Sequence, residues 1–336
     1  MSYATLSRMA FGYVSSQIVY AAVRLGVPEA LAAGPRPVAD LARTLGCDPD
    51  GLTRLVRALV VLGVLDEAGE GQVLLTELGR PLCADHPRSM RSSVLLFGDP
   101  PAWAAWGALA DGVRSGSAAF DHVHGRPLFD YLAESPSSAG VFHTAMREGT
   151  GSLAADIAAA YDFTGARTVV DIGGGNGALL AAVLAAAPAA KGILYDAPGG
   201  VADAPETFRR AGVTDRWRIE TGDFFTTVPA GDVLMLKGIL HDWDDERCLS
   251  LLRQCRDAIA PDGRLLVVEP VLPDSIRAPD AAGAVLSDIA MLVYTGGRER
   301  DENQFRKLFV ASGFDLAGIT APIGGSPIRI LVVHPG

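Results

Sequence analysis

Apolar residues recur at helical spacing through the first third of the chain and predict helices at residues 7–25, 38–45 and 51–62. The segment Gly26-Val27-Pro28 ends the first of them, because glycine and proline both disfavour its continuation. Residues 64–75 then have the pattern of a small hairpin. Helix, turn, helix and hairpin in this order predict a winged-helix domain.

The rest of the chain changes from a helical to an alternating pattern. Residues 97–161 have helical periodicity, with loops expected at 99–101, 122–127 and 134–138. The predicted strands that follow cover residues 168–172, 191–195, 217–221, 232–237, 263–268 and a terminal pair near 316–321 and 328–333. Helices are expected between them at about 177–187, 200–212, 244–260 and 302–312. This alternation predicts a doubly wound, mostly parallel sheet with an antiparallel edge.

We therefore predict an α/β chain in three parts. Residues 1–95 form a mainly helical winged-helix domain, residues 96–160 a helical linker or lid, and residues 161–336 a Rossmann-like doubly wound domain. In such a domain the ligand binds at the carboxyl ends of the strands, where the strand order reverses.

Winged helices commonly bind DNA, but the charges of this one argue against it. Between residues 36 and 66 the charged residues balance: Arg36, Arg43, Arg54 and Arg57 against Asp40, Asp48, Asp50 and Asp66. A helix that reads a DNA groove needs a basic surplus to neutralise phosphates. The whole chain carries a formal net charge of −10, and the predicted helix at residues 51–62 is rich in Leu and Val. We expect a dimerisation domain, a homodimer and no nucleic-acid partner.

The run T-V-V-D-I-G-G-G-N-G at residues 168–177 joins a buried strand to a glycine-rich turn and a helix. Glycine is needed where the backbone turns sharply or touches a ligand. The spacing Gly173-x-Gly175-x-x-Ala178 also fits a dinucleotide-binding turn, so a nicotinamide or flavin enzyme is an alternative. The carboxylate of Asp171, however, would repel a pyrophosphate and attract a cation. S-adenosylmethionine carries an ammonium and a sulfonium group and no phosphate, although Asp171 could also simply cap the turn.

Three further strand ends carry side chains suited to an adenosine cofactor. Asp196 closes the second strand, where a carboxylate can accept both hydroxyls of a ribose, or else belongs to a surface turn. Gly222, Asp223 and Phe224 close the third strand, where an acid can bind an adenine amino group and an aromatic face can pack on the ring. Lys237, a long cation, closes the fourth strand at the same edge.

His241 follows the fourth strand, in the loop where a substrate would approach the cofactor. An ordinary histidine pKa of about 6.5 suits a general base near neutral pH. Metal binding by His241 with Asp242 or Asp244 is an alternative, although no second histidine lies nearby in the sequence. Asp244 and its acidic neighbours have a simpler explanation, since they would begin a helix and complement its dipole.

These motifs together resemble S-adenosylmethionine-dependent O-methyltransferases of plant phenylpropanoid and bacterial aromatic natural-product pathways. The resemblance covers the winged-helix region and the segments V-D-I-G-G-G-N-G, G-D-F-F, L-K-G-I-L-H-D-W and G-G-R-E-R. It implies S-adenosylmethionine as cofactor, S-adenosylhomocysteine as product, His241 as base, and Glu269 and Glu299 as its acidic partners. It also implies cofactor contacts at Gly173, Asp196, Asp223, Phe224 and Lys237. Asp196 is followed by Ala-Pro where the family often has Leu-Pro.

A small aromatic substrate is expected between the sheet edge and the helical region. The candidate contacts are Phe142, Met146, Trp243, Asp288, Met291 and Tyr294, followed by Trp103 and Trp106. Met146 and Met291 lie where the resemblance implies thioethers around a flat ring, although either could be ordinary core. Methylation of carbon or nitrogen, a non-methylating reaction, and a winged-helix regulator that senses a metabolite are the alternatives to O-methylation.

The composition sets the remaining expectations. The four cysteines, Cys47, Cys83, Cys248 and Cys255, are dispersed without C-x-x-C spacing, which is typical of a reducing compartment and not of a zinc site. No apolar run approaches the roughly 20 residues needed to span a membrane. Residues 1–8 lack the basic-then-apolar layout of a signal peptide. We expect a cytoplasmic enzyme with no resident metal.

Overall fold

The computed structural model describes residues 2–213, 215–278 and 281–336. The chain divides into two compact units. The first contains the chain up to Trp103 together with Ser135–Glu148, and the second contains Ala104–Glu134 together with Gly149–Gly336. Each unit is described by itself below.

The first unit is mainly helical. Its elements begin with α1 (Tyr3–Ala10), α2 (Gly12–Leu25), α3 (Val27–Leu31), β1 (Arg36–Pro37), α4 (Val38–Leu45) and α5 (Pro49–Val61). They continue with β2 (Leu65–Glu67), β3 (Gln72–Leu75), η1 (Arg80–Leu82) and α6 (Arg91–Gly98), and α7 (Pro100–Gly107) begins here. The strands form a small sheet in the order β1-β3-β2 over one apolar core. The predicted sequence of helix, turn, helix and hairpin is confirmed.

The sequence predicts that helical structure ends after residue 25, but the structure shows only a one-residue interruption there. Gly26 has a left-handed φ of 79°, which ends α2, but a second short helix, α3, follows at once. Pro28 lies in the first turn of α3, where its missing N–H costs nothing. The expected loops at 99–101 and 134–138 likewise contain helix starts, since α7 begins at Pro100 and α11 (Pro136–Ala159) at Pro136.

The second unit contains an eight-stranded sheet. Its strands are β4 (Thr168–Ile172), β5 (Lys191–Asp196), β6 (Trp217–Thr221), β7 (Gly231–Lys237), β8 (Ile259–Leu272), β9 (Arg300–Asp301), β10 (Phe314–Ile319) and β11 (Ile328–Pro335). The main path runs β10-β11-β8-β7-β4-β5-β6, with β9 beside β8. The strands β8, β7, β4, β5 and β6 are parallel, whereas β11 and β10 are antiparallel, as predicted.

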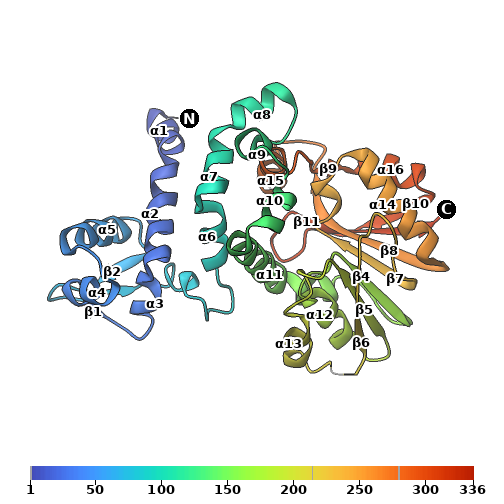
Figure 1. The fold of residues 1–336 in the computed structure, drawn as a ribbon, viewed down its shortest axis with the longest axis horizontal. Coiled ribbons are helices and arrows are strands. Elements are labelled where there is room, and N and C mark those ends of the chain that lie inside the picture. The colour runs from blue at the N-terminus through green and yellow to red at the C-terminus, as the bar shows by residue number, and fades with distance from the viewer. Residues whose placement is uncertain (1, 214, 279–280) are drawn as a thin grey trace. The chain divides into compact units, whose positions relative to one another are not determined.

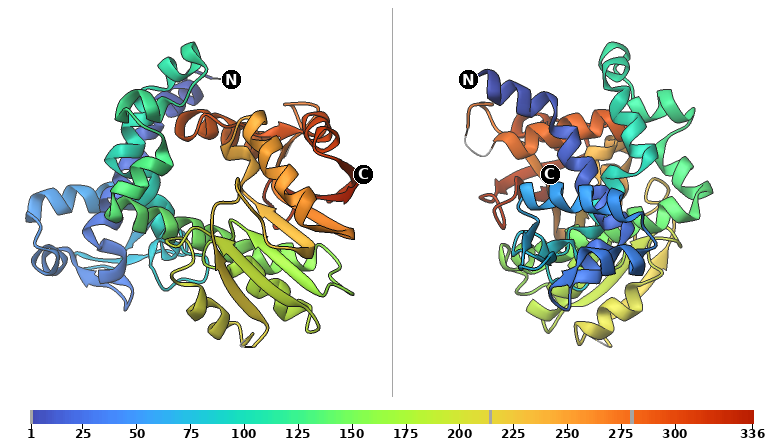
Figure 2. Two further views of the ribbon diagram at one scale, coloured as in Figure 1. Left: turned by 45° about the vertical axis from the view of Figure 1, so that its right-hand side comes forward. Right: turned by 90° about the vertical axis from the view of Figure 1, so that its left-hand side faces the viewer.

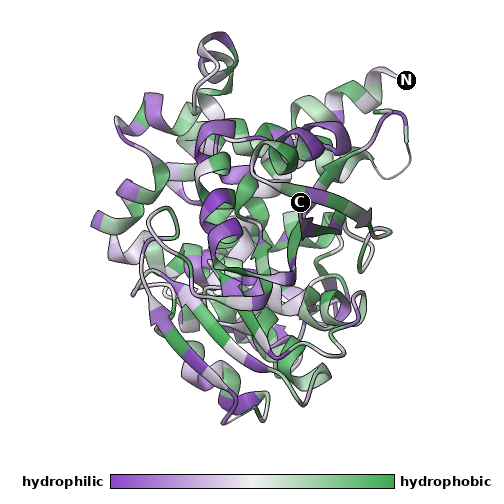
Figure 3. Cartoon of the chain, turned by 90° about the vertical axis from the view of Figure 1, so that its right-hand side faces the viewer, coloured by the Kyte–Doolittle hydropathy of each residue, from purple (hydrophilic) through white to green (hydrophobic). Residues whose placement is uncertain are grey.

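Helices cover both faces of this sheet (Figures 1 and 2). On one face α12 (Ala178–Ala186) and α13 (Ala204–Arg210) bury one apolar cluster against the strands. On the other face α14 (Asp245–Ala258) and α16 (Glu302–Ala311) bury a second cluster. Apolar residues run along the strands between them (Figure 3). The predicted doubly wound architecture is confirmed.

Further helices of this unit are α8 (Leu109–Ser115), α9 (Ala119–His124), α10 (Leu128–Glu134) and α15 (Ala281–Tyr294), and α11 ends in it at Ala159. The sequence pattern did not predict α15, although it contains three of the candidate substrate residues. Its apolar residues occur on nearly every side, so no helical stripe stands out. In the part of the chain described by the structure, no helix is both long and apolar enough to cross a membrane.

The strand order reverses between β4 and β7. β5 and β6 lie on one side of β4, while β7 and β8 lie on the other. At such a switch point the connecting segments leave in opposite directions and open a crevice at the carboxyl ends of the strands. The glycine turn after β4 and the His241 segment after β7 both begin at this edge.

Candidate active site

The three glycines after β4 have different neighbours. Gly173 and Gly175 have left-handed φ values of 68° and 56°. A Cβ on Gly173 would collide with the Ile239 side chain, and one on Gly174 would lie 2.5 Å from the Asp171 carboxyl group. A Cβ on Gly175 would meet nothing within 4 Å. The turn therefore packs against the protein at the first two glycines and leaves open space at the third.

Asp196 connects the end of β5 to this turn. One of its carboxylate oxygens accepts the Gly175 N–H at 2.8 Å, and the other accepts the Ala197 N–H at 2.6 Å. The carboxylate therefore lies beside the open position of the glycine turn. A ribose hydroxyl pair could donate to the same oxygens, because a carboxylate has about four lone-pair sites.

The G-D-F-F segment after β6 is explained in part by packing. A Cβ on Gly222 would collide with the Tyr195 hydroxyl, so this glycine is required whether or not a ligand binds. Asp223 accepts the Phe225 N–H at 2.9 Å, a local turn contact. Phe224 packs edge-to-face on Phe225, with ring centroids 4.8 Å apart. These contacts place all three candidate residues at the sheet edge without assigning them a ligand.

Asp171 and Lys237 are charged residues at the ends of the central strands. Asp171 is 1% exposed, and its Oδ2 has no hydrogen-bond partner among the described residues. Burial, reinforced by Asp196, raises its pKa to about 7. The Lys237 ammonium donates to the Thr150 hydroxyl at 3.0 Å, and burial lowers its pKa despite nearby carboxylates. Asp171 lies behind the glycine turn, so its effect on a ligand would be electrostatic.

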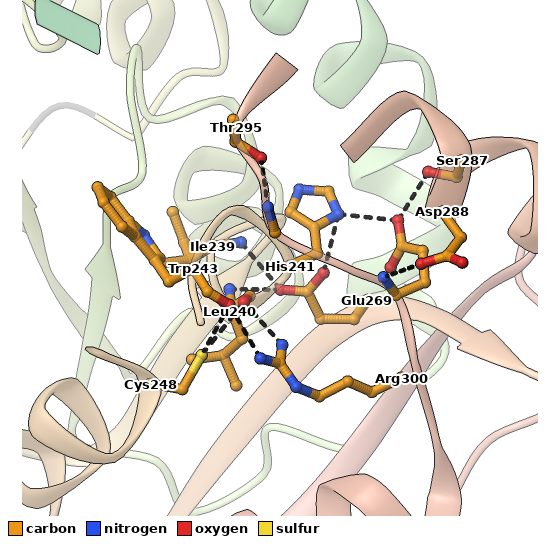
Figure 4. A network of polar contacts seen from close by, with 12 residues as sticks. Ile239, Leu240, His241, Trp243, Cys248, Glu269, Ser287, Asp288, Thr295 and Arg300 are labelled. Atoms are coloured by element: carbon orange, nitrogen blue, oxygen red, sulfur yellow. Dashed lines mark hydrogen bonds and ion pairs between the residues drawn. The ribbon is translucent and has the colours of Figure 1, made fainter. Parts of the chain in front are cut away.

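His241 lies in a short 3₁₀ segment, η2 (Leu240–Asp242), beyond the end of β7. Its Nδ1 lies 3.0 Å from Oε1 of Glu299 and 3.4 Å from Oε2 of Glu269 (Figure 4). Both glutamate side chains are fully buried, whereas 18% of the histidine side chain is exposed. The structure therefore brings the three candidate catalytic residues together, with the imidazole as the accessible member.

The two glutamates have different further contacts. Oε1 of Glu269 accepts the backbone N–H groups of Ile239 and Leu240, each at 2.9 Å. Oε1 of Glu299 accepts the Ser287 hydroxyl at 2.6 Å as well as facing His241. Glu269 therefore fixes the backbone that leads into the histidine, whereas Glu299 shares one oxygen between the histidine and a serine.

Arg300 holds the backbone on both sides of His241 and was not predicted from the sequence. It is 1% exposed, and it donates to the carbonyl oxygens of Leu240 and Trp243, both at 2.9 Å. Its guanidinium also binds Asp245 at 2.7 Å. The G-G-R-E-R segment predicts a role for Glu299, but no pattern indicates that the next residue contacts the histidine loop.

Charge sets the protonation of this cluster. Burial lowers the pKa of His241, but Glu269, Glu299 and Asp242 together outweigh it and raise the pKa to about 10. Burial raises the pKa of Glu269 and raises that of Asp242 to about 6. The ordinary histidine pKa assumed from the sequence does not apply here, because two buried carboxylates favour the imidazolium.

Comparisons with known proteins agree with this geometry. A model of the O-methyltransferase domain matches residues 106–315, and a model of the O-methyltransferase dimerisation domain matches residues 7–85. The chain is 42% identical to O-demethylpuromycin-O-methyltransferase of Streptomyces alboniger, over 97% of this chain and 88% of that protein.

The chain belongs to the O-methyltransferase family.

Solved structures of relatives show the same architecture. The crystal structure of LaPhzM has a TM-score of 0.93 and 38% identity, covering 99% of each chain. The structure of NcsB1, an O-methyltransferase from neocarzinostatin biosynthesis crystallised with S-adenosylmethionine and 2-hydroxy-5-methyl naphthoic acid, has a TM-score of 0.81 and 31% identity, covering 96% of each chain. The protein is thus an S-adenosylmethionine-dependent O-methyltransferase of the natural-product type, as the sequence motifs implied.

Five of the substrate candidates, counting Trp106, lie in the same unit as His241. Trp243 stacks on Phe129, with ring centroids 5.6 Å apart, and the Arg247 guanidinium lies 4.6 Å from its ring centre. Asp288 accepts the backbone N–H of Glu299 at 2.9 Å. The hydroxyl of Tyr294 accepts the indole N–H of Trp106 at 2.8 Å. Met291, the fifth, is partly buried in α15.

The other substrate candidates belong to the first unit. Phe142 packs edge-to-face on His143, Met146 is 43% exposed, and Trp103 ends the first segment of that unit. For the candidates in either unit, contact with the substrate remains a prediction from the sequence.

The His241 cluster also has the composition of a metal site, since one ligand atom from each of His241, Glu269 and Glu299 lies within 4.8 Å of the others. Its contacts, however, are those of a hydrogen-bonded network. Glu269 already accepts two backbone N–H groups, and Glu299 accepts the Ser287 hydroxyl. The absence of a resident metal remains an expectation for this methyltransferase.

Proposed function

We propose that this enzyme methylates a phenolic hydroxyl of a small aromatic secondary metabolite, with His241 as general base. The observation that supports the role of His241 is its contact with Glu299. Nδ1 faces two buried carboxylates, which orients the ring and leaves Nε2 without a hydrogen-bond partner among the described residues. A base held in this way can accept a proton from a hydroxyl at Nε2.

The proton transfer follows from the charges around the histidine. A phenol has a pKa near 10, close to that of His241, so the proton moves between groups of similar basicity. Glu299 and Glu269 stabilise the imidazolium that forms. Positioning of the two reactants can lower the reaction barrier by more than proton transfer to His241 does, since effective molarities correspond to ~7–11 kcal/mol for ideal alignment.

The residues at the sheet edge fit the cofactor of the family. The open space at Gly175 and the Asp196 carboxylate beside it suit a ligand with hydroxyls. Oδ2 of Asp171, which has no hydrogen-bond partner among the described residues, suits a positive charge. We propose the full set of contacts as Asp171, Gly173, Gly175, Asp196, Gly222, Asp223, Phe224 and Lys237. When bound, S-adenosylmethionine supplies an activated methyl group together with its own leaving group.

The substrate class and the assembly are inferred from related evidence. NcsB1 was crystallised with a naphthoic acid, and the partly buried rings of Trp243 and Phe225, with Phe129 stacked on Trp243, suit a flat ring. Phe142 and Met146 are proposed as substrate contacts from the sequence alone. The proposed division of the chain is residues 1–95, 96–160 and 161–336. The dimerisation domain supports a homodimer, as do exposed apolar residues near the start of the chain: Tyr3, Leu6, Met9 and Phe11. Free thiols at all four cysteines fit a cytoplasmic enzyme.

Two alternatives can be tested separately. A metal-assisted C-methyltransferase would contain bound metal and lose activity to chelators, and we expect neither for this chain. A metabolite-sensing regulator would shift DNA at low salt, which the balanced charges of the winged helix oppose. Methylation of a carbon or nitrogen atom has less need of a base placed as His241 is.

The deciding experiment combines binding with turnover. Calorimetric titration should show micromolar binding of S-adenosylmethionine and S-adenosylhomocysteine and none of NAD. A screen of phenols by mass shift then identifies a substrate. His241→Ala should lower turnover by about 10²- to 10⁴-fold with little change in cofactor affinity. His122→Ala, at an exposed histidine of α9, is the matched control. Near-normal turnover in His241→Ala would remove it as the base.

A further inference from the structure

Ser287 is connected to the catalytic histidine through a single carboxylate oxygen. Its hydroxyl donates to Oε1 of Glu299 at 2.6 Å, and the same oxygen lies 3.0 Å from Nδ1 of His241 (Figure 4). The serine comes from α15, the glutamate from the segment before β9 and the histidine from the segment after β7. The other oxygen of Glu299 has no hydrogen-bond partner among the residues described.

We propose that Ser287 is a positioning residue that sets the basicity of His241 by sharing the charge of Glu299. The inference rests on the proposed role of His241 as base. A hydroxyl that donates to a carboxylate stabilises its negative charge and reduces its attraction for a second proton donor. With Ser287 in place, Glu299 therefore orients the imidazole without holding the proton on Nδ1 as strongly as an unshared carboxylate would.

The balance matters because the histidine must release and accept protons. Two buried carboxylates favour the imidazolium, which cannot act as a base. Oε1 of Glu269 is occupied by two backbone N–H groups, and Ser287 supplies the corresponding donor to Glu299. Each carboxylate is thus partly neutralised by a donor other than the histidine.

Other charges near His241 are the same with and without the serine hydroxyl. They come from the adjoining segment, the neighbouring strands and α15, and comprise Asp242, Lys237, Glu269, Asp288 and the buried Arg300. Removal of the Ser287 hydroxyl therefore changes one hydrogen bond to Glu299 and leaves the surrounding charges in place. The residue is also small and partly buried, so Ser287→Ala removes one oxygen atom without adding volume.

The first test measures His241 directly, without substrate or cofactor. The ¹⁵N shifts of its imidazole, assigned by comparison with His241→Ala, are followed against pH in the wild type and in Ser287→Ala. We expect the pKa of His241 to rise in the variant by about 0.5–1 pH unit. Ser287→Thr, which keeps the hydroxyl, should restore the wild-type value. Ser250→Ala, at a partly buried serine of α14 with no hydrogen bond from its side chain among the described residues, should leave it unchanged.

The second test distinguishes an effect of Ser287 on the basicity of His241 from an effect on the local structure alone. Between pH 7 and 9, on the rising limb of kcat/KM, Ser287→Ala should lower kcat/KM about 3- to 10-fold, the factor that a pKa rise of about 0.5–1 unit predicts. A loss of kcat/KM in Ser287→Ala without a rise in the pKa of His241 would assign Ser287 a structural role and overturn the inference. An unchanged or lowered pKa of His241 would also overturn it. Absence of methyl transfer with a raised pKa would instead refute the proposed function alone.

Discussion

Oε1 of Glu299 lies 3.0 Å from Nδ1 of His241, closer than any oxygen of Glu269. Of the two buried acids, only Glu299 is within ordinary hydrogen-bonding distance of the ring nitrogen. Glu269 lies 3.4 Å from it and uses its other oxygen to hold the backbone of Ile239 and Leu240. The roles of the two acids are therefore divided: Glu299 orients the imidazole, and Glu269 holds the backbone of the loop that carries it.

This division predicts different effects for two matched substitutions. Glu299→Gln should lower kcat by roughly 10²- to 10⁴-fold, because the imidazolium loses its directly bonded anion. Glu269→Gln should lower kcat less and should reduce the free energy of unfolding by about 1–3 kcal/mol, because two backbone N–H groups lose a charged acceptor. Steady-state kinetics and urea unfolding measure the two effects. Equal kinetic effects of both substitutions would contradict the division.

The raised pKa of His241 predicts an alkaline pH profile. Only the neutral imidazole accepts a proton, and the carboxylates hold the histidine protonated below a pKa of about 10. The value of kcat/KM should therefore rise about tenfold per pH unit between pH 7 and 9, with no plateau in that range. Glu299→Gln should move this limb to lower pH, since one source of negative charge is removed. A wild-type plateau that begins near pH 7 would show that the carboxylates do not control the histidine.

The sequence predicted the elements that carry strong local patterns. The bounds of β4 and β6 were predicted to the residue, because β4 is a buried apolar run and β6 alternates apolar with charged residues. Asp244 caps α14 by accepting the Arg247 N–H at 2.8 Å, as its position before a helix indicated. The candidate triad of His241, Glu269 and Glu299 came from motifs and is assembled in space.

The features that the sequence did not predict depend on contacts between segments that are far apart in the chain. Gly283 of α15 packs against Pro327, a contact that no local pattern contains. Ser287 and Arg300 matter only because α15 and β9 lie beside the histidine segment. The pKa of His241 departs from the ordinary histidine value for the same reason, since it is raised by acids 28 and 58 residues further along the chain.

Asp171 predicts a proton release when the cofactor binds. Burial and Asp196 raise its pKa to about 7, so a large fraction is protonated at neutral pH. A cationic ligand favours the ionised form, so affinity for S-adenosylmethionine should increase as the pH rises from 5.5 to 7.5. Calorimetry in buffers with different ionisation enthalpies measures the released proton. Asp171→Asn should remove both effects, and a pH-independent affinity in the wild type would contradict the prediction.

The glycine turn predicts that three alanine substitutions will separate packing from binding. Gly174→Ala places a methyl group 2.5 Å from the Asp171 carboxyl and 2.6 Å from Leu194, so the free energy of unfolding should fall by about 1–3 kcal/mol. Gly175→Ala enters open space and carries only the strain of its φ of 56°, roughly 1–2 kcal/mol, but it should weaken cofactor binding. Gly199→Ala has neither a close neighbour nor a positive φ and is the control. Urea unfolding and calorimetric titration distinguish the three. If Gly175→Ala bound S-adenosylmethionine as the wild type does, the open space beside Asp196 would not be where the cofactor approaches the backbone.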